Sequence, residues 1–133
     1  MAGFSGDQAF PLKSLLAAGI PVALGSDGPL NPYLNIMLAA QHPAHPSEAI
    51  TREQAVIAYT RTSAYAEFAE HNKGTLESGK LADLAVLSQD IFSVPLADLP
   101  KTQSILTVVG GKVVYDAGQL DRGDSHRRVA LHR

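Results

Sequence analysis

Asp27 is the residue of this sequence whose type and setting best suit chemistry. It ends the apolar stretch 20–26 and is followed directly by Gly28 and Pro29, which break regular structure. A buried strand ends in this way when its last side chain must face a cavity. The alternative is structural, because an Asp before Gly-Pro often closes a turn or caps a helix. We single out Asp27 as the candidate catalytic residue, and no second residue in the sequence is recognisable as its partner.

A second group of possible ligands is the pair His42 and His45. Two histidines at this spacing can bind a metal ion when they lie on one turn of a helix. Prolines at positions 43 and 46 interrupt the pair, and proline disfavours a helix there. We therefore expect both histidines to be solvated loop residues.

Composition places the chain among small globular proteins. Its 133 residues suit one domain, and 45% of them are apolar, which is enough to bury a core. The sequence has no cysteine, which excludes disulfides and thiolate chemistry and suits the cytoplasm. A net charge of -2 and a tail whose arginines have no aromatic residues between them argue against a nucleic-acid partner. We also expect no membrane partner and no signal peptide, since no apolar run approaches the roughly 20 residues of a membrane span.

The first half of the chain predicts helices around one buried strand. Residues 10–18 form a helix that Gly19 ends, and residues 20–25 form a strand whose continuous apolar character is typical of burial on both faces. Asn31 is a good N-cap, with Pro32 as the first residue of the next helix, which runs to residue 40.

Thr51 opens what we expect to be the longest helix, because Thr51 and Gln54 match the capping-box pattern. Ser63 could cap a further short helix that ends at Glu70. We expect the large aromatic side chains of this region to pack in the core: Tyr59, Tyr65 and Phe68.

From residue 71 the pattern changes to strands. We predict a strand over residues 83–88, a loop over 89–102, and a hairpin over 105–115 that turns at Gly110-Gly111. The tail from Ala117 has little apolar content and is expected to be poorly ordered. We expect structural roles for four residues before the hairpin. Gly74 and Gly79 would be turn glycines with positive φ. Asp83 would accept hydrogen bonds from backbone N–H groups, and Lys80 would be structural.

Four segments in order resemble the amidohydrolase superfamily, most closely its amidohydrolase 3 branch. Residues 22–29 are similar to the end of the eighth barrel strand, and residues 51–60 to the helix that follows it. Residues 73–87 resemble the segment that leaves the barrel for a companion β-sandwich, and residues 108–115 the hairpin that closes that domain. The Gly-Lys-Leu-Ala-Asp-Leu-Ala-Val-Leu part of the third segment is the most specific of these motifs.

The resemblance implies an α/β fold. Residues 1–70 would be the last βα unit of a metal-dependent (β/α)8 barrel. Residues 71–116 would be part of the β-sandwich, a small antiparallel sheet, and 117–133 a tail. A complete barrel needs about 250 residues, so the chain would be a C-terminal fragment.

The implied activity is metal-dependent hydrolysis of C–N bonds in amides or cyclic amides, with zinc as the expected metal. Asp27 would be both a metal ligand and the carboxylate that takes a proton from the metal-bound water. The family's His-x-His pair and its other ligands before this Asp are missing from the sequence. We therefore expect this chain alone to hold no metal and to be inactive.

A second interpretation is that the chain is not catalytic and serves as an assembly or binding module. A strand such as residues 22–24, with unpaired edges, favours association with other polypeptide. The sequence thus predicts self-association, or pairing with a missing N-terminal half, beside the small-molecule substrate of the intact enzyme. It cannot specify the substrate.

Overall fold

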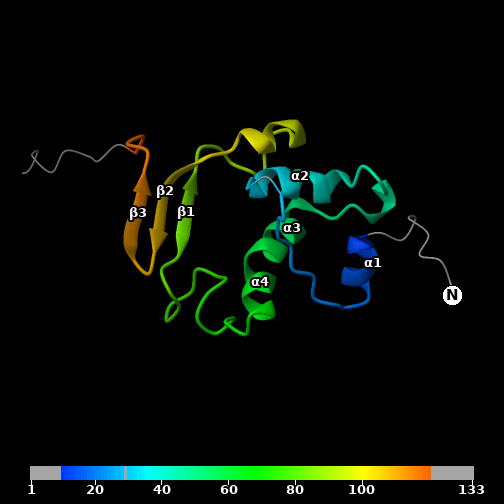
Figure 1. Cartoon of the computed structure of the whole chain (residues 1–133), viewed down its shortest axis with the longest axis horizontal. Helices are drawn as coiled ribbons and strands as arrows, with labels where there is room; N and C mark the ends of the chain where they lie inside the picture. Colours follow the sequence, from blue (N-terminus) through cyan, green and yellow to red (C-terminus); the bar gives the residue numbers. More distant parts are fainter. Residues whose placement is uncertain (1–9, 29, 121–133) are drawn as a thin grey trace, which may run out of the picture.

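The computed structural model describes residues 10–28 and 30–120, in which short helices lie beside a three-stranded antiparallel sheet (Figure 1). The helices are α1 (Leu12–Ala17), α2 (Pro32–Gln41), α3 (Arg52–Tyr59) and α4 (Arg61–Ala66), with the 3-10 turns η2 (Pro46–Glu48) and η3 (Leu96–Lys101). The strands are β1 (Leu84–Leu87), β2 (Ser104–Val109) and β3 (Lys112–Asp116). The sheet lies at one end of the molecule and α1 at the other, with α2, α3 and α4 between them (Figure 1). Across the described ranges, no helix has the length and apolar character that crossing a bilayer requires.

The starts of the two longer helices are as predicted. Asn31 accepts a hydrogen bond from the Leu34 N–H at 3.0 Å, and Pro32 is the first residue of α2. At α3, the Gln54 N–H donates to the Thr51 hydroxyl at 3.1 Å, and the Thr51 N–H donates to Gln54 Oε1 at 2.9 Å. Together these two bonds complete the capping box.

The expectation that Thr51 opens the longest helix is wrong. α3 has 8 residues and α2 has 10. Thr60 ends α3 because its backbone leaves the helical region, with φ of -116° and ψ of -83°, while its hydroxyl bonds back to the Val56 carbonyl at 2.8 Å. Such back-bonding by Thr offers the backbone an alternative to the helix, so the pattern divides into α3 and α4.

Two expectations for the region after Thr60 are also wrong. Ser63 is not an N-cap but lies inside α4, which ends at Ala66 and not at Glu70. Of the three aromatic side chains expected in the core, only Tyr59 packs against it, while Tyr65 is 54% exposed and Phe68 is 92% exposed. α4 buries the small Ala64 instead, and Phe68 follows its end in the left-handed region with φ of 60°.

The hairpin and the strand before it are confirmed. β2 pairs with β3 in antiparallel register, and the turn glycines Gly110 and Gly111 have φ of 56° and 77°. β1 pairs with the other side of β2, so the order is β1-β2-β3. The loop expected between β1 and β2 is only partly irregular, because η3 forms within it. That turn forms because Leu99, which it carries, is completely buried.

The roles expected for the residues that lead into the sheet are confirmed. Gly74 and Gly79 have φ of 94° and 92°. The Asp83 carboxylate accepts a hydrogen bond from the Gly110 N–H at 2.6 Å, which joins the start of β1 to the hairpin turn. Lys80 donates to the Thr75 hydroxyl at 2.7 Å and pairs with Glu77 at 3.0 Å, so its role is structural.

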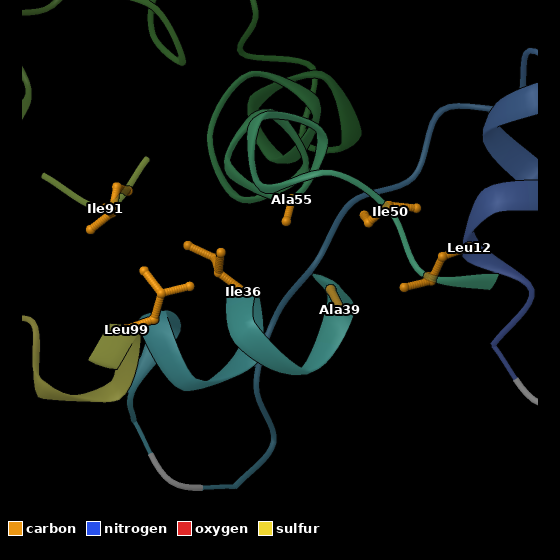
Figure 2. Packing of buried hydrophobic residues seen from close by; sticks show 7 residues of the cluster. All are labelled: Leu12, Ile36, Ala39, Ile50, Ala55, Ile91 and Leu99. Carbon is orange, nitrogen blue, oxygen red and sulfur yellow. The ribbon is translucent and has the colours of Figure 1, made fainter. Parts of the chain in front are cut away.

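One apolar cluster joins α1, α2 and α3 to the segment between β1 and β2 (Figure 2). It contains these buried residues: Leu12, Ile36, Ala39, Ile50, Ala55, Ile91 and Leu99. Ile36 and Ala39 come from α2, and Figure 2 shows Leu99 and Ile91 facing α2 from the side of the 89–102 segment. The core therefore fixes the position of α2 between the sheet side and α1.

Residues 20–25 do not form the predicted strand. A parallel-type strand needs neighbouring strands for its backbone hydrogen bonds, and the one sheet in the described ranges contains β1, β2 and β3 alone. The tail expected to be poorly ordered lies outside the described residues from position 121 on. The first residue of that expected tail, Ala117, is described. Its N–H donates to the Ile105 carbonyl at 2.9 Å and so continues the β2–β3 pairing beyond the end of β3.

Candidate active-site segment

The segment that carries Asp27 is extended and connects α1 to α2 (Figure 1). Val22 and Leu24 are half-buried and pack against the core, while the residues between and after them are exposed. One side of the segment therefore faces the core and the other is open, which corrects the expectation of burial on both faces.

The segment is held at two points, one on each side of Asp27. Before it, the Leu24 N–H donates to the Ala58 carbonyl at 3.1 Å, at the junction of α3 and α4. After it, the Asn31 side-chain amide donates to the Pro100 carbonyl at 3.0 Å while its oxygen caps α2. Asp27 thus lies between two residues, Leu24 and Asn31, that are hydrogen-bonded to other parts of the fold.

Asp27 itself is exposed. The chain bends at Asp27 and Gly28, and the Gly28 N–H donates to the Ser26 hydroxyl at 3.3 Å. The sequence predicted that this side chain faces a cavity, and within the described residues it is exposed instead. The bend itself, at the residue where the apolar run stops, is as predicted.

Ser63 strengthens the first anchor of this segment. Its hydroxyl lies 2.8 Å from the Ala58 carbonyl oxygen and 3.4 Å from the Leu24 carbonyl oxygen. It therefore contacts both residues of the Leu24–Ala58 link. Sequence reasoning assigned Ser63 to a helix cap, because a hydroxyl near a helix start has that role in local sequence and nothing there indicates a partner 39 residues away.

The helix that follows Asp27 in the chain, α2, has no charged residue. Burial raises the pKa of Tyr33, so its hydroxyl stays neutral at physiological pH. Further along α2, the Asn35 amide donates to the Tyr59 hydroxyl at 2.6 Å. These groups are neutral and serve packing, and they are not acid–base partners for a carboxylate.

The donors in this structure do not fit a complete metal site. A catalytic zinc ion takes about three protein ligands. Within residues 10–28 and 30–120, no group of three or more His, Asp or Glu side chains is placed to hold a metal ion. Asp27 could therefore supply at most one carboxylate to a site that the described residues do not complete.

His42 and His45 are not a metal pair, and His42 is not solvated. His42 is 6% exposed and caps the C-terminus of α2 in the left-handed region, with φ of 44°. Its Nε2 lies 2.8 Å from the Phe10 carbonyl oxygen, and its Nδ1 accepts a hydrogen bond from the His45 N–H at 3.1 Å. Because backbone groups satisfy both ring nitrogens, the imidazole can be buried, and the expectation for this residue is wrong.

Comparison with known proteins places the chain beside hydrolases. The model of a family described as the Amidohydrolase family matches residues 5–115. N-substituted formamide deformylase of Arthrobacter pascens is 34% identical over 116 residues, which are 80% of this chain and 21% of that protein. Imidazolonepropionase of Thermoplasma volcanium is 31% identical over 119 residues, which are 88% of this chain and 28% of that protein.

A solved structure gives the same result for the fold. The amidohydrolase from Thermotoga maritima matches with a TM-score of 0.59 and 26% sequence identity. The match covers 79% of this chain and 25% of that one. The chain therefore spans between 21% and 28% of the length of these three proteins.

Proposed function

Because this chain belongs to the amidohydrolase family, we propose that it is the C-terminal part of a metal-dependent hydrolase that cleaves C–N bonds of amides or cyclic amides. Residues 1–70 would supply the last βα unit of a barrel, and residues 71–116 part of a companion β-sandwich. The family is generally metal-dependent, and zinc is the metal we propose. The name of the relative N-substituted formamide deformylase denotes removal of a formyl group from N-substituted formamides, which are amides.

The observation that carries the proposal is the position of Asp27. It follows an extended apolar segment, at a bend, between anchors at Leu24 and Asn31. Its carboxylate is exposed and therefore accessible to water and to other polypeptide. Such a group can take part in proton transfer with a substrate or water brought to it.

Other polypeptide would have to complete the site. The described residues do not make a metal site, so Asp27 would be one of several ligands. The exposed side of residues 20–25 supports this, because other polypeptide could pair with the backbone there, apart from the N–H groups of Ile20 and Leu24, which are already bonded. We propose that pairing of this kind turns the extended segment into the barrel strand expected from the sequence.

The test is to read the coding DNA upstream of Met1 and to produce the longest in-frame protein. We expect a His-x-His segment, bound zinc, and hydrolysis of an N-formyl amine or a cyclic amide in a substrate panel. Asp27→Asn should lower turnover by about 100-fold or more while leaving the circular dichroism spectrum unchanged. Asp90→Asn, which changes an exposed carboxylate that bonds within its own turn, is the matched control. Unchanged turnover in Asp27→Asn would refute the role of this residue.

A second candidate function is that of an assembly module without catalysis. β3 is an edge of the sheet, and three of its consecutive residues, Val113, Val114 and Tyr115, are more than half exposed. An exposed apolar edge strand favours pairing with another chain. This reading predicts self-association of the 133-residue chain, or its pairing with a separate N-terminal half, and no activity in any complex. Light scattering that shows a monodisperse monomer would count against self-association, and zinc-dependent activity would exclude the non-catalytic reading.

A further inference from the structure

Asp27 and Gly28 form a dipeptide in which the aspartate can react with its own backbone. In such a reaction the side-chain carboxyl group and the nitrogen of the next residue close a ring. Glycine favours it, because glycine has no side chain to hinder attack by its backbone nitrogen. Asp-Gly occurs once in the 133 residues, and Asn-Gly, which reacts in the same way, does not occur. The sequence thus points to one position, and the structure decides whether that position is open to reaction.

The structure leaves this dipeptide open. Asp27 and Gly28 lie at a bend, outside any helix or strand, and both are exposed. A Cβ atom at Gly28 would meet nothing within 4 Å beyond its chain neighbours. Ring formation here therefore displaces no packed side chain of the described residues and breaks no helix or sheet hydrogen bond.

The contact that restrains the reacting nitrogen is weak. The Gly28 N–H donates to the Ser26 hydroxyl at 3.3 Å in an exposed position, whereas protein N–H···O bonds are usually about 2.7–3.2 Å long. Water can take the place of this acceptor. The hydrogen bonds at Leu24 and Asn31 lie on either side of the dipeptide and do not include its backbone groups. The bend can therefore change its conformation while both of these attachments stay in place.

The other aspartates of the described ranges lack this combination. Each precedes a residue that has a side chain, and each carboxylate accepts a hydrogen bond from a backbone N–H group or, in one case, from a lysine: Asp83, Asp90, Asp98 and Asp116. A carboxylate bonded in this way must give up its partner before it can turn toward the nitrogen of the next residue.

We propose that Asp27 is a site of spontaneous isomerisation, through a succinimide ring that it forms with the Gly28 nitrogen. The nitrogen attacks Cγ of the protonated carboxyl group, a C–N bond forms, and the C–OH bond breaks, so that water leaves with the amide hydrogen. Water then adds to one of the two ring carbonyl groups and breaks its bond to nitrogen. Opening at Cγ restores aspartate, and opening at the backbone carbonyl gives isoaspartate. Water is the only co-reactant.

Isoaspartate at this position would change both the segment and its carboxylate. The backbone gains the Cβ methylene group, so the chain between Leu24 and Asn31 becomes longer. The carboxylate is then attached directly to Cα and moves relative to the residues around it. If Asp27 is the catalytic carboxylate of the proposed hydrolase, isomerisation inactivates the site. This consequence rests on the proposed function, whereas the reaction itself does not.

The test is to incubate the folded 133-residue chain for several weeks at about pH 6, where a small fraction of carboxyl groups is protonated. An isoaspartyl methyltransferase with labelled S-adenosylmethionine detects isoaspartate, and electron-transfer fragmentation of the peptides locates it. We expect isoaspartate at position 27 to exceed that at each of the other described aspartates by about fivefold or more, while the circular dichroism spectrum shows that the chain stays folded. No isoaspartate at position 27, or equal amounts at another described aspartate, would overturn the proposal.

Gly28→Ala tests the role of the glycine. The added methyl group hinders the nitrogen, yet it fits the fold, because the position is open and Gly28 does not have a positive φ. We expect isomerisation of Asp27 to slow by about fivefold or more, which corresponds to a barrier higher by about 1 kcal/mol. Gly25→Ala is the matched control, since Gly25 is equally open, also lacks a positive φ and does not follow an aspartate. Equal rates in the two variants would overturn the proposal.

Asp27→Asn gives a second check with a different readout. An amide at this position closes the same ring and releases ammonia in place of water, and hydrolysis then leaves a carboxylate. Mass spectrometry detects this change, and we expect it to proceed faster than isomerisation of Asp27. An amide that outlasts the isomerisation of the original chain would overturn the proposal. Turnover of Asp27→Asn should accordingly be measured on freshly prepared protein.

Discussion

Replacing Gly74 with alanine should destabilise this protein far more than the same change at Gly79. Both glycines have nearly the same positive φ, 94° and 92°. They differ in their surroundings. A Cβ atom at Gly74 would lie 2.7 Å from the Ala64 Cβ, 3.1 Å from the Arg61 Cα and 3.3 Å from the Thr60 carbonyl oxygen, whereas one at Gly79 would meet nothing within 4 Å. The pair therefore separates backbone strain from a steric clash.

The expected magnitudes follow from these two terms. A residue other than glycine at such a φ costs about 1–3 kcal/mol, and this cost applies to both variants. The extra methyl group at Gly74 meets Ala64, which is buried, and backbone atoms of α4, which cannot turn away as a long side chain could. Overpacking of this kind costs about 1–3 kcal/mol more. We expect Gly79→Ala to lose about 1–3 kcal/mol of unfolding free energy and Gly74→Ala about 2–6 kcal/mol.

The assay is urea unfolding of both variants and the original chain, followed by circular dichroism at one temperature. Stability differences of this size clearly move the urea concentration at which half of the protein is unfolded. The unfolding free energy of a small protein falls by only about 1–3 kcal/mol per molar urea. Equal losses for the two variants would refute the close approach of α4 to residue 74. A Gly79→Ala loss larger than that of Gly74→Ala would refute the assignment of the clash altogether.

Three further changes test other parts of the structure. Leu99→Ala removes three carbon atoms from a side chain with 0% exposure, and burial of each carbon contributes about 0.8 kcal/mol to the unfolding free energy. The cavity left behind brings the total loss to about 3–5 kcal/mol. Leu76→Ala is the control, because Leu76 is 73% exposed and its loss should change stability by less than about 0.5 kcal/mol in the same urea assay. Asp83→Ala removes the acceptor of the Gly110 N–H, so we expect a loss of about 1 kcal/mol and faster exchange of that amide; exchange that stays slow would contradict this link. Asp90 has a pKa lowered by the Phe92 N–H and the Ser93 hydroxyl, so it stabilises the fold above about pH 3.8 and ceases to do so as the pH falls through its lowered value. The melting temperatures of the original chain and Asp90→Asn should therefore converge from about pH 5 to about pH 3, and a constant difference would show that these bonds do not depend on ionisation.

Patterns that act over a few residues were predicted correctly from the sequence. The capping box at Thr51, the N-cap at Asn31 and the Gly110-Gly111 turn all form where their residues indicate. Each depends on a hydrogen bond or a φ value within about four residues, so the local sequence contains all the information. The family resemblance also rests on short motifs, and the family match over residues 5–115 confirms it.

Features that depend on partners far along the chain were not predictable. The burial of His42 requires the Phe10 carbonyl, which is 32 residues away, and the role of Ser63 requires Leu24, which is 39 residues away. Phe68 was expected inside because it is large and apolar, yet it is exposed since nothing among the described residues covers it. Size and polarity state what a side chain prefers, and only packing decides whether a neighbour is there.

The sequence by itself determined the family, the helix starts, the hairpin and the choice of Asp27 as the candidate catalytic residue, because these follow from motifs and local hydrogen bonds. Tertiary structure alone decided that residues 20–25 remain extended without forming a strand, and that Asp27 is exposed on a segment held at Leu24 and Asn31. The physical reason is that a parallel strand exists only beside other strands. Its sequence can favour that conformation, but its hydrogen bonds must come from polypeptide elsewhere in space.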